Sequence, residues 1–319
     1  MSKKSNIQGH AYEFICIETL LNTINDKIPN SAIIDVNGAY SVAKNAWINT
    51  SDNLKDILQQ SAIVATNTLF DMEPTLLLSD NTPLLLEIQS DDKGKEGDVR
   101  DIVVSRSNIK WEIGLSLKHN HFAVKHSRIA KTLDFGSKWY GSSCSKKYWE
   151  DISPIFEYLD EMKALKKKWK EINGKEERVY IPLLKAFIAE IMRSYNNDSS
   201  MTKRMVEYLL GKFDFYKIIS IDSKNITRIQ SYNLHGQLNK VSKTVKPKIS
   251  IPIVMLPNRI VDVAFKPNST NTVELYMNEG WQFSFRIHNA STYVETSLKF
   301  DIQIVGLPST IITIDCYGK

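Results

Sequence analysis

An acid and a lysine in two neighbouring apolar segments are the residues of this chain best suited to chemistry. Asp101 opens the apolar run 102–104, and Lys118 lies at the end of a second run that begins at Trp111. A carboxylate binds a hard divalent cation through oxygen, and a nearby ammonium can orient or deprotonate a water molecule and neutralise charge on a phosphate. The pair therefore indicates metal-dependent hydrolysis of a phosphodiester.

The two apolar segments are expected to form a β-hairpin. Turn residues at 106–109 separate two runs that have the length and composition of buried strands. In a simple hairpin centred on this turn, the positions opposite Ser116 and Lys118 fall near 99 and 97, and Asp101 keeps their parity. Asp101, Ser116 and Lys118 are therefore predicted to share one face of the hairpin.

A further carboxylate lies on the apolar face of a predicted helix. Residues 8–27 have the periodicity of an amphipathic helix whose apolar stripe includes Ile17, Leu20 and Ile24. Glu13 lies on this stripe, four residues before Ile17, so its carboxylate is expected to point toward the core. A buried carboxylate is costly, which suggests that Glu13 has a function.

The acid and lysine pattern resembles that of the PD-(D/E)xK nuclease superfamily, in which an acid on one strand precedes an acid-x-lysine tripeptide on the next. Here the tripeptide is Ser116-Leu117-Lys118, so the second acid is absent. Another carboxylate or the main-chain carbonyl of Leu117 has to complete the site. The candidate carboxylates are Glu87, Asp98, Glu112 and Glu13. Asp98 also competes with Asp101 for the principal metal position, although it could equally pair with Arg100.

Several segments together resemble the HaeIII-type restriction endonucleases. They are residues 8–13, 97–101, 111–118, 119–128, 278–290 and 297–301. The resemblance spans both ends of the chain and implies Mg²⁺-dependent cleavage of double-stranded DNA at GGCC, in a restriction-modification system with a protecting cytosine methyltransferase. A palindromic target is also compatible with a two-fold homodimer.

The predicted mechanism is hydrolysis at an Mg²⁺ ion that Asp101 holds with help from Glu13, Glu87 or Asp98. Lys118 would position the attacking water, and Ser116 would orient neighbouring groups rather than bind the metal. Two alternatives remain open. One is a repair or structure-specific nuclease of the same fold, and the other is a DNA-binding protein without enzymatic activity, which the missing second acid makes conceivable.

Basic and amide side chains beyond the hairpin and near the C-terminus are candidates for DNA contacts. Arginine can bond both acceptors of guanine in the major groove, which accommodates a two-stranded ribbon. Alternation puts Arg286 and His288 on one face of a strand. The full set of candidates is His119, His121, Lys125, His126, Arg128, Arg286, His288 and Asn289. For any single basic residue, a surface salt bridge is the common alternative to a base contact.

Composition sets looser limits on the class of protein. The chain has 319 residues, of which 42% are hydrophobic, and a formal net charge of +5, which suits a polyanionic partner without establishing one. Its 3 cysteines have no short paired spacing that would indicate a zinc site or a disulfide framework. No signal peptide or membrane-spanning segment is recognisable, so we expect a cytoplasmic protein without a membrane partner.

The order of predicted elements suggests the fold class. Helical patterns dominate the first part of the chain, and strands dominate after residue 213. This order predicts an α+β or α/β fold in which a PD-(D/E)xK-like mixed sheet is flanked by helices, with a β-rich C-terminal region. We expect residues 1–212 to form a nuclease core with a helical insertion, and residues 213–319 to form a β-rich region that recognises DNA.

Overall fold

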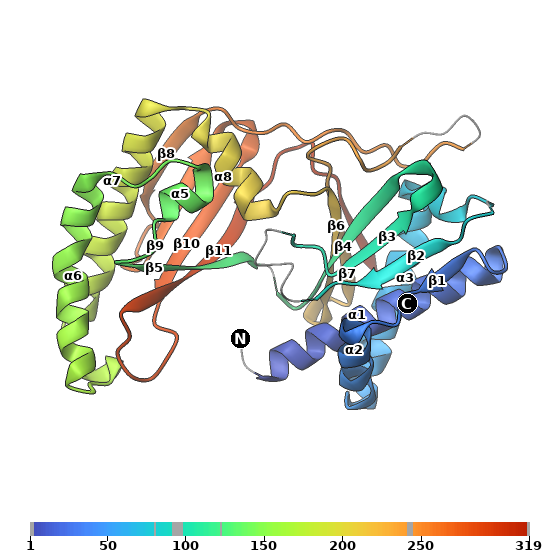
Figure 1. Cartoon of the computed structure of the whole chain (residues 1–319), viewed down its shortest axis with the longest axis horizontal. Coiled ribbons are helices and arrows are strands. Elements are labelled where there is room, and N and C mark those ends of the chain that lie inside the picture. The colour runs from blue at the N-terminus through green and yellow to red at the C-terminus, as the bar shows by residue number, and fades with distance from the viewer. Residues whose placement is uncertain (1–2, 80, 91–97, 122, 241–244, 318–319) are drawn as a thin grey trace. The chain divides into compact units, whose positions relative to one another are not determined.

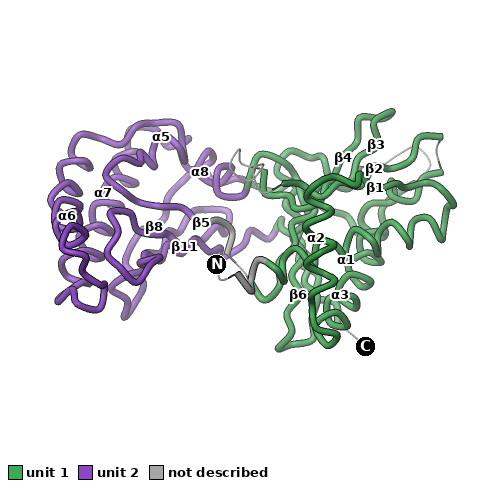
Figure 2. The backbone as a smooth tube through the Cα atoms, turned by 60° about the horizontal axis from the view of Figure 1, so that its bottom comes forward, with its two compact units in different colours: residues 1–122, 211–255, 310–319 green, residues 123–210, 256–309 purple. Residues whose placement is uncertain are grey.

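The computed structural model describes all residues except 1–2, 80, 91–97, 122, 241–244 and 318–319. The chain divides into two compact units, each built from separate stretches of sequence (Figure 2). Unit 1 contains residues 1–122, 211–255 and 310–319, and unit 2 contains residues 123–210 and 256–309. Among the described residues, no helix has an apolar stretch long enough to cross a membrane.

Unit 1 contains a seven-stranded mixed sheet in the order β1-β2-β3-β4-β6-β7-β12. Its strands are β1 (Ala32–Ile34), β2 (Leu84–Ile88), β3 (Ile102–Arg106), β4 (Trp111–His119), β6 (Phe215–Ile221), β7 (Ile226–Tyr232) and β12 (Thr313–Tyr317). The pairs β1–β2 and β4–β6 are parallel, whereas the other neighbours are antiparallel. The helices α1 (Lys3–Lys27), α2 (Gly38–Ile48) and α3 (Asp52–Met72) pack with this sheet (Figure 1).

The apolar stripe of α1 supplies much of the core of unit 1. Ile17, Leu20 and Ile24 are at most 1% exposed, as the periodicity of the sequence predicts. They join one apolar cluster with the strand residues Leu115 and Leu117, which alternate with polar neighbours along β4. One face of the central strands is therefore committed to the core, and the other face is left for the polar residues.

Unit 2 contains a five-stranded antiparallel sheet in the order β5-β11-β10-β9-β8. Its strands are β5 (Ala123–Ala130), β8 (Ile260–Phe265), β9 (Thr272–Met277), β10 (Gln282–His288) and β11 (Ser297–Gly306). Its helices are α5 (Phe135–Tyr140), α6 (Lys146–Ala164), α7 (Ile181–Asn197) and α8 (Met201–Leu210). Aromatic rings of α5 and α7 pack against Phe285 and Phe300 of the sheet, with ring centroids between 5.2 and 6.2 Å apart.

The α+β class is confirmed, but the compact units differ from the expected division at residue 212. Strands β8 to β11 form a sheet with β5, whereas β6, β7 and β12 extend the sheet of unit 1. The helices between β5 and β6 therefore belong with the C-terminal sheet instead of forming an insertion in the core. A local sequence pattern identifies a strand but not the distant strand with which it pairs. It therefore cannot predict that each unit is built from separate stretches of the chain. The sequence of the apolar segment 249–256 is typical of a strand, but the segment has no regular secondary structure.

A buried carboxyl group ties the end of α3 to the sheet and to a following loop. Glu73 is 0% exposed, and its Oε1 accepts hydrogen bonds from Tyr216 Oη at 2.7 Å and from Asn239 N at 2.5 Å. Burial raises the pKa of Glu73 to about 7, although both hydrogen bonds oppose this change. The folded protein therefore binds a proton at Glu73 at a pH where the unfolded chain has lost it.

The free energy of unfolding is expected to fall between about pH 4.5 and pH 7 because of Glu73. In this range the unfolded chain releases the proton first, and the accumulated loss above pH 7 is about 3 kcal/mol. Glu73→Gln cannot ionise, so its free energy of unfolding should lack this decline. Urea unfolding across the range measures the difference between the two proteins.

Asp26→Asn, which removes an exposed carboxylate from α1, is the control for the general effect of pH. It should follow the wild type. A wild-type protein and a Glu73→Gln variant with parallel pH dependences would contradict the role assigned to Glu73.

Candidate active site

Asp101 is the centre of the polar site in unit 1. Its Oδ2 accepts hydrogen bonds from Leu117 N at 2.6 Å, Lys118 Nζ at 2.9 Å and Ser116 Oγ at 3.3 Å. The side chains of Asp101 and Lys118 are 23% and 29% exposed, so the ion pair is accessible from solvent but partly desolvated. Hydrogen bonds to a charged group are stronger than those between neutral groups. The three bonds to Oδ2 therefore fix the orientation of the Asp101 carboxylate.

The hairpin of β3 and β4 brings these residues together. Ile102 pairs with Leu115, which places Asp101 beside Ser116 on one face of the sheet. The shared face is as predicted, but the pairing differs by two residues from that of a simple hairpin. The cause is a longer turn: a 3₁₀ turn at 107–109 is followed by Lys110, whose φ is 50°. A shift by an even number of residues preserves the face.

Glu13 of α1 lies near this pair of charges. Its side chain is 14% exposed, and its Oε2 is 2.9 Å from His10 Nδ1, one turn earlier in the helix. Burial raises the pKa of Glu13, the hydrogen bond to His10 lowers it, and the negative charge of Asp101 raises it further. Lys118 also acts electrostatically on Glu13. The carboxylate expected from the helical periodicity therefore belongs to the same charge cluster as Asp101 and Lys118.

Lys217 is a residue of this cluster that sequence reasoning missed. It lies on β6, pairs with Ser116 of β4, and is 5% exposed. Burial and, to a smaller extent, the charge of Lys118 together lower the pKa of Lys217 to about 7, although the charge of Asp101 opposes both. The available signal was a lysine within the largely apolar strand segment 215–221. A charge in a buried strand is costly, so it indicates a specific role.

The three other candidate carboxylates, Asp98, Glu112 and Glu87, differ in their surroundings. Asp98 forms a buried ion pair with Arg100, which contacts both carboxylate oxygens of Asp98 and also binds Glu112 at 2.8 Å. The Arg100 side chain lies over Gly114, where a Cβ atom would be 2.0 Å from Arg100 Cδ. Glu87 is half-buried on β2 and pairs with Val103, which lies two residues after Asp101. Glu87 therefore lies on the same face of the sheet as Asp101, but on the neighbouring strand and two residues away from the position opposite Asp101.

The donor atoms suit a hard divalent cation. All hydrogen bonds to the Asp101 side chain within the described residues are to Oδ2, and Oδ1 accepts none. The Glu13 bond to His10 uses Oε2. Carboxylate oxygens are the ligands that such cations prefer. No group of three or more His, Cys, Asp or Glu side chains with metal-binding geometry is found among the described residues. Within the described residues, Asp101 and Glu13 would supply the carboxylates for a cation here, with water and phosphate oxygens as further ligands.

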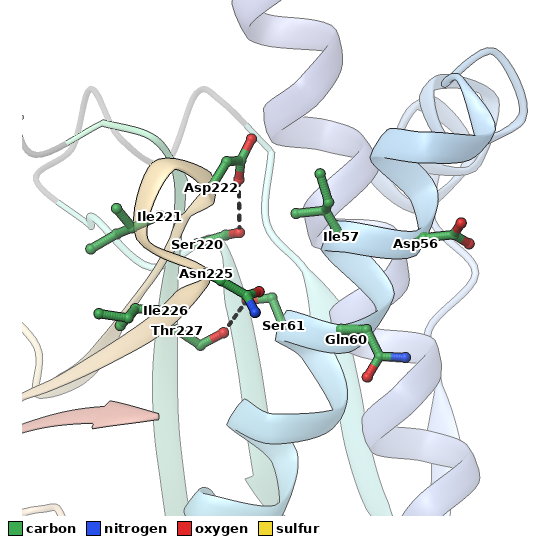
Figure 3. Close-up of a pocket in the computed structure, with 10 residues that line it drawn as sticks. All are labelled: Asp56, Ile57, Gln60, Ser61, Ser220, Ile221, Asp222, Asn225, Ile226 and Thr227. Carbon is green, nitrogen blue, oxygen red and sulfur yellow. Dashed lines mark hydrogen bonds between the residues drawn. The ribbon is translucent and has the colours of Figure 1, made fainter. Parts of the chain in front are cut away.

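Two of the predicted DNA-binding residues, His119 and His121, lie in unit 1. His119 Nε2 is 2.8 Å from Asp222 Oδ2, and Asn120 joins the same carboxylate at 2.8 Å. Asp222 also borders a cavity of about 180 Å³ (Figure 3). The cavity is lined by Asp56, Ile57, Gln60, Ser61, Ser220, Ile221, Asp222, Asn225, Ile226 and Thr227. His121 is half-buried, close to the end of β4.

The remaining predicted DNA-binding residues lie in unit 2. The side chains of Lys125 and His126 are outside the described part of the structure. Arg128 on β5 is half-exposed and donates a hydrogen bond to Ser297 Oγ at 2.6 Å. The other three candidates lie on or just after β10.

Arg286 and His288 share the polar face of β10, as the alternation predicts. The Arg286 side chain is 54% exposed, and its guanidinium lies 3.2 Å from Asp301 Oδ2 on β11. Burial lowers the pKa of His288, and the charge of Arg286 acts in the same direction. Asn289 instead holds the following turn, because it accepts a hydrogen bond from Tyr180 Oη at 3.2 Å and donates one to the carbonyl oxygen of Ser291 at 2.9 Å.

A mixed sheet flanked by helices that carries an acid and a lysine on adjacent strands is typical of nucleases that hydrolyse phosphodiesters. The family model described as HaeIII restriction endonuclease matches residues 9–308. The chain is also 53% identical to the type II restriction enzyme HaeIII of Haemophilus aegyptius over 318 residues, which are 99% of this chain and 98% of that enzyme. No solved structure matches the chain.

The chain therefore belongs to the HaeIII restriction endonuclease family and is a type II restriction endonuclease. Membership of this family decides between the alternatives that the sequence left open, against a repair nuclease and against a DNA-binding protein without activity. It also implies DNA as the substrate and a divalent metal ion as the cofactor.

Proposed function

We propose that this enzyme hydrolyses double-stranded DNA at GGCC with Mg²⁺ as its cofactor. The observation that carries the proposal is the ion pair of Asp101 and Lys118, 2.9 Å apart on adjacent strands, in a chain of the HaeIII family. The extent of the similarity to the HaeIII enzyme supports the target sequence. In this proposal a cytosine methyltransferase protects the host DNA, the enzyme works in the cytoplasm where that DNA is, and a homodimer matches the palindrome.

Asp101 and Glu13 would hold the metal ion, with Asp98 and Glu87 as the less favourable candidates. Asp101 Oδ1 makes no hydrogen bond within the described part of the chain, whereas both oxygens of Asp98 bind Arg100. The ion would polarise the scissile phosphate and neutralise part of its charge.

The protein side chains would position the reacting groups. Lys118 Nζ would donate a hydrogen bond to the attacking water or to a phosphate oxygen, while Asp101 Oδ2 keeps the ammonium in place. Ser116 would orient Asp101 through its hydroxyl, which is 3.3 Å from the same carboxylate oxygen. The DNA contacts would come from His119, His121, Lys125, His126 and Arg128, and from Arg286, His288 and Asn289 on the second sheet.

The first experiment incubates the purified protein with unmethylated plasmid DNA and Mg²⁺ and sequences the ends of the fragments. We expect all ends to fall within GGCC, because the proposed enzyme reads that sequence. Asp101→Ala and Lys118→Ala should each leave no measurable cleavage, since one removes the metal ligand and the other the cation that positions the water.

Binding of a GGCC duplex in Ca²⁺ separates a loss of chemistry from a loss of folding. Both variants should retain most of this binding. Full cleavage by either variant would contradict the assignment of the site, and ends outside GGCC would leave a nuclease with a different target.

Glu13→Gln should reduce the cleavage rate at a fixed Mg²⁺ concentration by about 100-fold, because it removes a metal-binding charge while it preserves size and a hydrogen bond to His10. Higher Mg²⁺ concentrations should restore part of the rate. The measurement is a metal titration of single-turnover cleavage.

Glu18→Gln is the matched control on the same helix, where the carboxylate accepts a hydrogen bond from Tyr40 Oη at 2.8 Å. It should cleave like the wild type. Normal metal dependence in Glu13→Gln combined with a strong loss in Glu87→Gln or Asp98→Asn would assign the second carboxylate to that residue instead.

Arg286→Ala should weaken binding of the GGCC duplex more than binding of unrelated DNA, because a bidentate contact to guanine discriminates by about 1–3 kcal/mol. Competition binding in Ca²⁺ measures both affinities. Lys266→Ala, which removes another exposed cation from the same sheet, is the control. An equal loss on all sequences would make Arg286 a phosphate contact.

A further inference from the structure

We propose that Lys217 is a second cationic residue of the cleavage site, which contacts a non-bridging oxygen of the scissile phosphate from the strand next to Lys118. The proposal rests on the proposed function, since it assigns a further residue to the same reaction. It differs from the sequence-based mechanism, in which Lys118 is the only lysine.

The position of Lys217 follows from the pairing of three strands. The parallel pair β4–β6 places Lys217 beside Ser116, and the antiparallel pair β6–β7 places Gln230 on its other side. Neighbouring strands are about 4.8 Å apart, and paired residues project from the same face of a sheet. The Lys217 side chain therefore leaves the sheet on the face that carries Asp101 and Lys118.

The burial of Lys217 needs an explanation that packing does not provide. A buried ammonium costs several kcal/mol relative to water, and an apolar side chain of similar length would fill the same space. The neighbours along β6, Tyr216 and Ile218, point to the opposite face and join the apolar core. The lowered pKa of Lys217 reflects the same cost of burial. A lysine on the face of Asp101 and Lys118 is most useful where negative charge arrives or develops.

Ser116 and Lys217 together account for the departure from the acid-x-lysine pattern. An acid at position 116 would stand beside Lys217 in the β4–β6 pairing and would form a cross-strand ion pair with it. A serine hydroxyl carries no charge, so position 116 does not neutralise Lys217. The site therefore has one metal-binding acid fewer on β4 and one lysine more on β6, and both differences increase the positive charge that faces a bound phosphate.

The reaction itself gives this charge a role. The oxygen of the attacking water bonds to phosphorus and the water gives up a proton. The bond from phosphorus to the leaving sugar oxygen breaks with its electron pair, and that oxygen takes up a proton. Negative charge increases on the non-bridging oxygens during this step. A cation fixed in a desolvated site stabilises that charge without reorganisation, and Lys217 would act in its protonated form.

Lys217→Met tests the proposal, because methionine keeps the apolar stem and removes the charge. We expect single-turnover cleavage to fall by about 100-fold, as for the loss of one donor to a developing oxyanion. Lys217→Arg should recover part of the rate. Binding of the duplex in Ca²⁺ should weaken by at most about tenfold, and the thermal unfolding midpoint should not fall, because the variant removes a buried charge. Ser220→Ala, a buried residue on the opposite face of β6, should match the wild type in all assays.

A second measurement needs neither metal nor cleavage. Binding in EDTA is compared for a GGCC duplex and for the same duplex with an uncharged methylphosphonate at the scissile position, located from the sequenced ends. The wild type and Lys217→Arg should prefer the charged duplex, and Lys217→Met should lose roughly tenfold of that preference. Ser220→Ala should retain it.

Three results would overturn the proposal. They are near-normal cleavage by Lys217→Met, an unchanged preference for the charged duplex in that variant, and unfolding of both Lys217→Met and Lys217→Gln, which would indicate a structural role. Cleavage by the wild type in the same preparation tests the proposed function separately. Failure of the wild type to cut would overturn both proposals, whereas a loss confined to the Lys217 variants concerns Lys217 alone.

Discussion

The hydrogen bonds to a single oxygen of Asp101 are the constraint on which the rest of the site depends. The Leu117 N–H, the Ser116 hydroxyl and the Lys118 ammonium all donate to Oδ2, so the start of β3 is fixed against the end of β4. Because one oxygen takes all of these donors, the other oxygen is left as a potential ligand. The same strand β4 then determines which residue of β6 joins the site, and the parallel register selects Lys217.

The site contains four charged side chains in a partly buried position. Such a position is unfavourable for a charge unless a group of opposite charge lies nearby. Two carboxylates, Glu13 and Asp101, lie near two lysines, Lys118 and Lys217, and each of these groups has limited access to water. Charge interactions strengthen as water is excluded, so such a cluster acts strongly on a bound phosphate or cation. Burial of these charges lowers the free energy of unfolding. The apolar cluster on the opposite face of the same strands, which includes residues of α1, offsets this loss.

Much of the site could be predicted from the sequence because it depends on local periodicity. The hairpin parity gave the shared face of Asp101 and Lys118, and the helical period gave the inward position of Glu13. The predicted cross-strand partner of Asp101 was wrong by two residues, because the left-handed conformation of Lys110 lengthens the turn. No local sequence pattern predicts this conformation. Lys217 was missed because about 100 residues separate β4 from its parallel neighbour β6, and only the pairing of the two strands brings them together. The interleaved division of the chain has the same cause.

The second sheet has only one polar face, because aromatic packing occupies the other. Phe285 and Phe300 contact rings of the covering helices, so alternation directs Arg286 and Asp301 to the polar face, where they form an ion pair. Arg286 is half-exposed but Asp301 is buried, so the carboxylate loses a charged partner if the arginine leaves. A bidentate contact of arginine with guanine contributes about 1–3 kcal/mol of discrimination. In the proposed contact with guanine, Arg286 would leave Asp301 only for a base that accepts both of its hydrogen bonds. At a base without these acceptors the arginine would stay on Asp301, so the ion pair would favour specificity at a cost in affinity.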